Sequence, residues 1–404
     1  MIDLSLMRSL LQKFSVPYQY PVHFTSRVFA PENTVLVDTL RAAGRGPYRV
    51  LVVVDEGALE GNTQLLEQID AYFHQHRETL SLVRSALVFS GGEAGKNGSQ
   101  AYKMVQAAIH QAGICRQSFV IAIGGGALLD LVGYAAGTAH RGVRLVRMPT
   151  TVLSQNDSGV GVKNSVNAFK KKNFLGTFTP PFAVINDFAF LTSLSHRDWI
   201  GGTSEAVKVA LLKDPDFFDF IEANADALVA HDEATMKHLV YRSAELHLRH
   251  IGEGGDPFET RSSRPLDFGH WSAHKLEQMT NFELRHGEAV AIGIALDSTY
   301  SYLDGLLPLA DCERILALLS RLGFSLTVPE AAQGAGVSEL LHGLVEFREH
   351  LGGELTITLL RGIGNPIEVH RIDEELVMSS VRRLQESSWP AELPAQVSVQ
   401  MSAV

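Results

Sequence analysis

The chain has 404 residues, 45% of them hydrophobic and 20% charged, so we expect a globular protein of two or three domains. Its net charge of −10 argues against a nucleic-acid partner, which would require a basic face, but leaves room for a phosphorylated small molecule. With two cysteines, Cys115 and Cys312, no disulfide framework and no membrane-spanning apolar run, we expect a cytoplasmic protein without a membrane partner.

The first half of the sequence alternates short apolar runs with helical patterns. This alternation predicts a parallel sheet covered by helices on both faces. Ligands of such sheets bind at the carboxyl ends of the strands. We expect strands at 49–55, 87–90, 118–123, 145–149 and 182–187, with a helix at 101–112.

The second half is helical from about residue 194. We therefore predict an α/β protein with an N-terminal Rossmann-like parallel-sheet domain at 1–187 and an α-helical domain at 188–386. A flexible tail rich in Ser, Pro, Ala and Gln is expected at 387–404. The expected helices are 204–213, 217–229, 233–250, 289–303, 310–322 and 337–350, with a late strand or hairpin at 354–360.

Three consecutive glycines, at 124–126, follow a predicted strand and precede a helix. Glycines there let the backbone approach a phosphate, and the helix N-terminus presents N–H groups. The spacing is not G-x-G-x-x-G, so a structural turn is an equally good interpretation. Polar residues at other strand ends favour a nucleotide site, namely Asp55, Glu93 with Lys96, and Thr150 with Thr151.

Residues 157–173 form a basic stretch that also contains glycines. Lys163, Lys172 and Asn173 lie within it. Cations and free backbone N–H groups both suit a phosphate, although a lysine run is more often a solvated loop. The apolar, turn-rich flanks place the stretch beside the ligand end of the sheet.

A carboxylate and several histidines have the spacing of a metal site. Glu205 shares a helical face with Lys208, three residues later. His270 and His274 share a face if their segment is helical, and His286 begins another helix. One carboxylate with two or three imidazoles is typical of catalytic zinc. Because the chain has 16 histidines, spacing alone leaves this site a hypothesis.

In their order and spacing these segments resemble the sugar-phosphate cyclase superfamily, whose best-known member is 3-dehydroquinate synthase. The resemblance extends from Arg49 to Leu360. Its motifs are GGExxK at 91–96, GGGxxxDxxG at 124–133, RG from Arg141, PTTxLxxxDSxxGxK at 149–163, KN at 172–173, SEAVK at 204–208, FGHxxxH at 268–274 and HGEAV at 286–290.

The resemblance implies a dehydroquinate synthase-like fold that binds NAD in the first domain and a divalent metal, zinc or cobalt, between the domains. Metal ligands would be Glu205, His270 and His286. Dinucleotide contacts would be Asp55, Glu93, Lys96, Gly125, Gly126, Asp130, Thr150, Thr151, Lys172 and Phe190.

The family's reaction joins transient oxidation by NAD, phosphate elimination, re-reduction and intramolecular aldol cyclisation, and is that of a carbon–oxygen lyase acting on phosphates. The resemblance implies catalytic roles for Asp157, Lys163, Lys208 and His274. It implies that Asn173 joins Lys163 and His274 in holding the leaving phosphate. An arginine matched by Arg141 reaches the neighbouring subunit's phosphate site, which implies a homodimer.

The substrate pocket departs from that of 3-dehydroquinate synthase. The arginine expected seven residues before the metal-binding His270 is Ser263, flanked by Arg264, and an upstream lysine is matched by Arg249. Asp267 replaces an asparagine, as in cyclases that use sedoheptulose 7-phosphate. We therefore predict substrate binding by Arg141, Asn173, Arg249, Arg264 and Asp267, and a sugar phosphate without the carboxylate of 3-deoxy-arabino-heptulosonate 7-phosphate.

Three alternatives stay open: a true 3-dehydroquinate synthase, a metal-dependent glycerol or alcohol dehydrogenase, and a non-catalytic relative. The segments 163–173 and 204–208 favour a cyclase over a dehydrogenase. A non-catalytic relative is disfavoured because idle buried charges cost stability.

Overall fold

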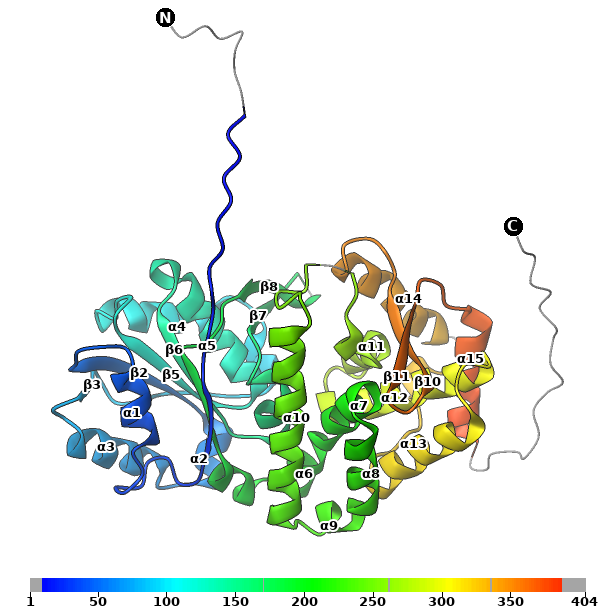
Figure 1. Ribbon diagram of the computed structural model, residues 1–404, viewed down its shortest axis with the longest axis horizontal. Coiled ribbons are helices and arrows are strands. Elements are labelled where there is room, and N and C mark those ends of the chain that lie inside the picture. Colours follow the sequence, from blue (N-terminus) through cyan, green and yellow to red (C-terminus); the bar gives the residue numbers. More distant parts are fainter. Residues whose placement is uncertain (1–8, 170, 261, 335, 387–404) are drawn as a thin grey trace, which may run out of the picture.

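The computed structural model describes residues 9–169, 171–260, 262–334 and 336–386, so the tail expected at 387–404 lies outside the described residues. Figure 1 shows two halves side by side, one built around a sheet and one helical. The sheet has seven strands in the order β1-β9-β6-β5-β2-β3, with β4 also paired to β2, and every pairing is parallel. Its strands are β1 (Val22–Thr25), β2 (Tyr48–Asp55), β3 (Leu80–Leu82), β4 (Leu87–Phe89), β5 (Phe119–Gly124), β6 (Arg144–Pro149) and β9 (Ala183–Asp187).

Helices cover both faces of this sheet, which confirms the predicted fold class. Along β2, Val50 and Val52 belong to one apolar cluster while Leu51 and Val53 belong to another, because successive side chains of a strand point to opposite faces. Both faces are buried, so β2 and β5 are apolar almost without interruption. The covering helices are α1 (Val35–Arg41), α2 (Glu56–Gly61), α3 (Leu65–Gln75), α4 (Gln100–Gln111) and α5 (Gly126–Thr138).

The basic stretch is an antiparallel hairpin rather than the expected loop. It consists of β7 (Lys163–Ala168) and β8 (Lys171–Phe178). Val166 pairs with Leu175, and both join the apolar cluster beneath α5. These two apolar positions hold the hairpin on the domain, and the polar Asn164, Ser165 and Asn167 of β7 are buried with them.

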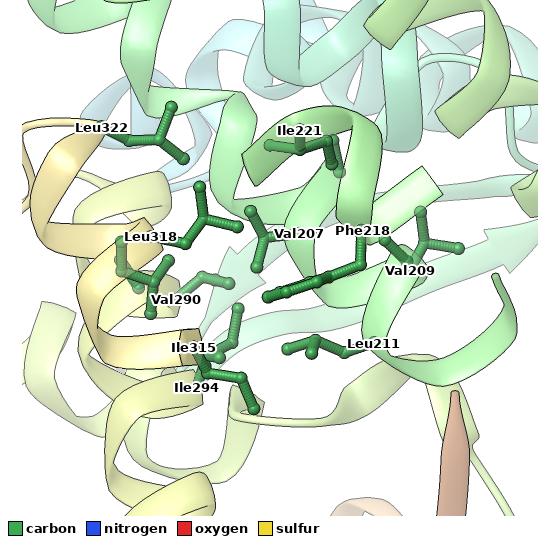
Figure 2. Packing of buried hydrophobic residues seen from close by; sticks show 14 of the residues in the cluster. Val207, Val209, Leu211, Phe218, Ile221, Val290, Ile294, Ile315, Leu318 and Leu322 are labelled. Atoms are coloured by element: carbon green, nitrogen blue, oxygen red, sulfur yellow. The ribbon is translucent and has the colours of Figure 1, made fainter. Parts of the chain in front are cut away.

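The helical half surrounds α12 (His286–Leu303), whose residues are buried from Ala289 to Tyr302. A helix that is apolar on all sides belongs in a core. Figure 2 shows Phe218 of α8 lying among Val207 and Leu211 of α7 and Ile294 of α12. The other helices are α6 (His196–Gly201), α7 (Thr203–Lys213), α8 (Pro215–Ala223), α9 (Ala225–Val229), α10 (Glu233–Glu253), α11 (His270–Met279), α13 (Leu309–Arg321), α14 (Gly336–His350) and α15 (Glu374–Gln385).

One detail of this half differs from expectation. The helix expected at 217–229 is divided at Asn224, whose side-chain amide donates to the Phe220 carbonyl and ends α8. Of the late strand or hairpin expected at 354–360, the structure has the hairpin, β10 (Ile357–Gly362) with β11 (Asn365–Val369). In the part of the chain that the structure describes, no helix combines the length and hydropathy that a membrane span requires.

Short helical turns connect the helices and strands of both halves: η2 (Glu93–Lys96), η3 (Ala139–Arg141), η4 (Ser154–Ser158), η5 (Phe188–Ser193), η6 (Pro265–Asp267) and η7 (Glu330–Ala332).

Candidate active site

A cleft of about 1400 Å³ lies between the two halves. The carboxyl ends of β2, β5 and β6 form one wall, and α11 with the start of α12 forms the opposite wall. A parallel sheet places ligands at this edge. The predicted site residues that line the cleft are Asp55, Glu93, Lys96, Gly125, Gly126, Asp130, Thr150, Thr151, Asp157, Lys163, Lys172, Asn173, Phe190, Lys208, Arg264, Asp267, His270, His274 and His286.

Two predicted substrate residues lie elsewhere. Arg249 is exposed on α10, and its guanidinium lies 2.6 Å from Glu245 one helical turn away. Arg141 is exposed in η3 with a φ of 62°. Neither lines the cleft, so the structure does not group them with the other candidates, and their substrate contacts stay predictions.

Three predicted metal ligands converge at the cleft, where His270 and His286 line the wall and Glu205 is buried beside them. The Nε2 atoms of His270 and His286 lie 3.5 and 3.4 Å from Oε1 of the buried Glu205. Both carboxylate oxygens of Glu205 are buried; Oε2 lies 2.6 Å from Nζ of Lys208, and Oε1 faces the two imidazoles. A carboxylate with free lone pairs and two imidazoles is a three-ligand set that leaves a position open, so these residues fit a catalytic divalent metal.

Hydrogen bonds orient both imidazoles toward Glu205. Nδ1 of His270 lies 3.1 Å from the Phe268 carbonyl, and Nδ1 of His286 lies 3.2 Å from Glu277. Each contact assigns a proton to Nδ1 and turns Nε2, the atom that would bind a metal, toward Glu205. Sequence reasoning missed Glu277, although it lies on α11 seven residues after His270 and therefore on the same face.

A second trio, His274, Glu277 and His286, also has ligand atoms close enough for a metal. However, Nζ of Lys172 lies 2.8 Å from both oxygens of Glu277. Burial opposes ionisation of Glu277, but Lys172 and His286 hold its pKa well below the usual range. Lys172 occupies both oxygens of Glu277, whereas Lys208 contacts only Oε2 of Glu205 and leaves Oε1 to the two histidines, so a metal is better accommodated at Glu205.

Lys208 is buried between two carboxylates. It lies 2.6 Å from Glu205, and burial, which lowers its pKa, is outweighed by Glu205 and Asp157, which raise it. Burial likewise opposes ionisation of Asp157, but Lys208 brings the pKa of Asp157 down to about 2. His247, which the sequence did not single out, lies 2.7 Å from Asp157. The cleft therefore holds a charged ammonium beside an ionised carboxylate.

The proposed phosphate ligands have different partners. Nζ of Lys163 lies 2.7 Å from Glu259, whereas Oδ1 of Asn173 accepts from Lys96 at 2.5 Å. The backbone around Lys163 is held by Arg147, a fully buried residue of β6 that donates to the Lys163 carbonyl at 2.6 Å. Sequence reasoning found neither Glu259 nor Arg147.

On the wall formed by the sheet, glycines let the backbone come close to a ligand, as the binding of a dinucleotide requires. A Cβ on Gly91 would lie 2.2 Å from Asp55, and one on Gly126 would lie 2.6 Å from the Ser158 hydroxyl, which is buried and unpartnered among the described residues. The first turn of α5 follows Gly125 and has no side-chain cap. Its N–H groups are thus available to a phosphate, so these residues fit a dinucleotide.

Comparisons with known proteins agree with this geometry. Residues 86–201 match the 3-dehydroquinate synthase N-terminal family, and residues 202–343 match the 3-dehydroquinate synthase C-terminal family. The chain is 33% identical to a 2-epi-valiolone synthase from Actinosynnema mirum over 91% of this chain and 99% of that one. It is 32% identical to a 3-dehydroquinate synthase from Rhodospirillum rubrum, over 94% and 96% of the two chains. The structure of ValA, a 2-epi-5-epi-valiolone synthase from Streptomyces hygroscopicus subsp. jinggangensis 5008 with NAD+ and Zn2+ bound, superposes with a TM-score of 0.83 at 29% identity, covering 95% and 100%.

Proposed function

Because the chain belongs to the 3-dehydroquinate synthase family, we propose that it is a sugar-phosphate cyclase, a carbon–oxygen lyase that releases phosphate and forms a carbocycle. One observation carries this proposal. The Glu205, His270 and His286 trio lies beside the Lys208–Asp157 pair, at the carboxyl edge of the sheet.

We assign NAD to the wall of the cleft around Asp55, Gly125 and Gly126, and a divalent metal, zinc or cobalt, to Glu205 and its two histidines. When bound, NAD would take up and return a hydride, and the metal would act as a Lewis acid. The Streptomyces relative with NAD+ and Zn2+ supports both assignments.

The chain's own residues supply the remaining chemistry of the proposed reaction. Lys208 keeps its proton and donates a hydrogen bond to a substrate oxygen, while ionised Asp157 accepts a hydrogen bond from a substrate hydroxyl group. Burial and then Lys172 lower the pKa of His274 well below its usual value, so this imidazole is neutral. A neutral His274 donates one hydrogen bond to the phosphate, together with Lys163 and Asn173.

For the substrate we propose a seven-carbon ketose phosphate without a carboxylate, such as sedoheptulose 7-phosphate. Ser263 stands where 3-dehydroquinate synthases have an arginine, and Asp267 adds a negative charge to the lining of the cleft. A substrate carboxylate there would be repelled. The relatives include both valiolone and dehydroquinate synthases, so they do not decide between the two substrates. The proposed substrate therefore rests on the residues of the pocket.

Phosphate release and NADH absorbance separate the candidate functions. Purified protein with NAD+ and Zn2+ would be given sedoheptulose 7-phosphate, 3-deoxy-arabino-heptulosonate 7-phosphate or glycerol. We expect phosphate from the first substrate without net NADH. Net NADH would indicate a dehydrogenase, phosphate from the second substrate alone a true 3-dehydroquinate synthase, and binding without turnover a non-catalytic relative.

We further propose that the enzyme acts as a homodimer in the cytoplasm. Arg141 is exposed and does not line the cleft of its own subunit, so it is available to a second subunit. Cys115 and Cys312 are both free, as expected in a reducing compartment.

A further inference from the structure

Asp297 is a buried carboxylate that no step of the proposed reaction uses. It lies on α12, and each of its oxygens accepts one hydrogen bond at the start of α11. Oδ2 accepts from the Gly269 N–H at 2.9 Å, and Oδ1 accepts from the ring N–H of Trp271 at 2.9 Å. Both donors are neutral, and burial raises the pKa of Asp297 to about 7 although these two hydrogen bonds lower it. A carboxylate placed in this way costs the fold stability, and such groups gather at functional sites.

The two donors are the neighbours of His270 on either side in the chain. One carboxylate therefore fixes the backbone before this histidine and the side chain after it. Gly269 has a φ of 76°, in the left-handed region, and a Cβ there would lie 2.7 Å from the backbone nitrogen of Ile294 on α12. The start of α11 is thus pressed against α12 at the residue that Asp297 holds. Between these two anchors, Nε2 of His270 lies 3.5 Å from Glu205.

The helix that carries Asp297 also carries the other imidazole of the proposed metal site. Asp297 follows His286 on α12 by about three helical turns, so both side chains lie on the same face of the helix. That face meets α11, because His286 contacts Glu277 near the end of α11 and Asp297 contacts Trp271 at its start. The two helices are therefore tied together at both ends. Helix α12 positions His286 directly and His270 through Asp297.

We propose that Asp297 is a positioning residue of the metal site: by holding Gly269 and Trp271 it aims Nε2 of His270 at the metal. This inference rests on the proposed function and deepens it, because it assigns the geometry of the metal site to a residue that does not touch the metal. Hydrogen-bonding partners behind metal ligands orient those ligands, and their loss typically weakens metal binding about 10–100-fold. A purely structural Asp297 would stabilise the fold and leave the affinity for metal unchanged.

The test removes the two hydrogen bonds with small changes. Trp271→Phe loses the ring N–H and keeps an aromatic ring, and Asp297→Asn replaces one accepting oxygen with an amide nitrogen that cannot accept. Full-length holoenzyme of each variant would be equilibrated with a zinc chelator in the presence of NAD+, and the retained zinc would give the Kd. We expect both variants to bind zinc about 10–100-fold more weakly than wild type. The double variant should bind little more weakly than the worse single variant, because both changes break one contact.

A matched control separates positioning from stability. Ile315→Val deletes one buried methylene from α13 in the same half of the molecule, so it should destabilise the fold and leave zinc affinity unchanged. With Co2+ in place of zinc, the visible absorption reports the coordination geometry of the metal. This absorption should shift in Trp271→Phe and Asp297→Asn and should not shift in Ile315→Val.

Wild-type zinc affinity and an unchanged cobalt spectrum in both site variants would overturn the inference, as would an equal loss of zinc affinity in Ile315→Val. If Asp297→Asn does not fold, Trp271→Phe decides alone. None of these measurements depends on turnover. A wild type that retains zinc but releases no phosphate would refute the cyclase function, while the zinc affinities of the variants would still decide the role of Asp297.

Discussion

Lys208 fixes the charge of its surroundings because it is buried between Glu205 and Asp157. An ammonium removed from water stabilises neighbouring carboxylates in their ionised form. Glu205 therefore presents a full negative charge to a metal, and Asp157 remains a hydrogen-bond acceptor over the physiological pH range.

Removing the charge of Glu205 should abolish metal binding. We expect Glu205→Gln to lose bound zinc and turnover while NAD+ binding is kept, because the dinucleotide wall is separate. In wild type, zinc at a hundred times its Kd should stabilise the fold by about 2.7 kcal/mol, seen as a rise in Tm that the variant lacks. Elemental analysis and thermal melts check this, with exposed Glu67→Gln as the control. Full zinc occupancy in Glu205→Gln would refute the ligand assignment.

His250 should make the protein less stable in mild acid. Burial, helped by Lys213, lowers the pKa of His250 from 6.5 to about 4. As pH falls from about 6.5 to 4, the unfolded chain binds this proton before the folded one does, so the free energy of unfolding decreases in that window and is unaffected above it. His250→Gln should flatten the fall in Tm between pH 7 and 4.5, whereas exposed His110→Gln should not. Equal slopes in all three proteins would contradict the assignment.

Sequence patterns predicted which residues gather in the cleft better than they predicted the contacts among those residues. Glu205, His270 and His286 converge as predicted because each lies on a helix whose motif could be read locally. Glu277 and His247 were not predicted because their roles depend on contacts with other elements, namely with His286 and Asp157. Glu259 lies in a turn whose approach to Lys163 depends on tertiary folding.

At the level of elements, α11 and α12 carry two of the proposed metal ligands and touch backbone to backbone. A Cβ on Gly293 would lie 2.0 Å from the Gly269 carbonyl oxygen. Gly293→Ala should therefore push the helices apart, lower the free energy of unfolding by about 1–3 kcal/mol and weaken zinc binding. Urea unfolding and zinc titration check this. Gly252→Ala on α10, where a Cβ meets nothing within 4 Å, is the matched control, and a Gly293→Ala protein as stable as wild type would contradict the packing argument.

The hairpin is joined to α11 by the buried pair of Lys172 and Glu277. Lys172→Met leaves a buried carboxylate without its cation and should cost about 3–5 kcal/mol in urea unfolding of the metal-free protein. Adding Glu277→Leu should restore most of that loss, since it removes the unpaired charge. The adjacent Lys171→Met should cost far less, because Lys171 and its partner Glu349 are both exposed. Similar losses for both lysine variants would contradict the burial argument.

Elements with a clear hydrophobic pattern were predicted from the sequence. Elements that depend on tertiary contacts were not. The apolar runs of β2 and β5 could be read directly. The β7–β8 hairpin was taken for a loop because its lysines and glycines outnumber the two apolar residues, Val166 and Leu175, that anchor it. Helix α15 was not predicted, although an Asp373 cap begins it.

At the level of the whole molecule, the proposed dimer can be tested by complementation. If Arg141 serves the neighbouring subunit's site, Arg141→Ala and Lys208→Met homodimers should each be inactive. Unfolding and refolding them together should restore part of the activity, because one site of each mixed dimer receives both intact residues. Refolding either variant alone is the control, and absence of rescue in a mixture shown to be dimeric by sedimentation would argue against a shared site.

The position of β1 at the edge of the sheet has a consequence for biosynthesis. Its neighbour in the sheet is β9, and the segment that becomes β9 is translated about 160 residues after β1. At roughly 5–20 residues per second, the ribosome needs on the order of 10–30 s to deliver that partner. During this interval Val22–Thr25 emerges with its backbone unpaired, so nascent chains stalled before residue 183 should be those that chaperones retain longest.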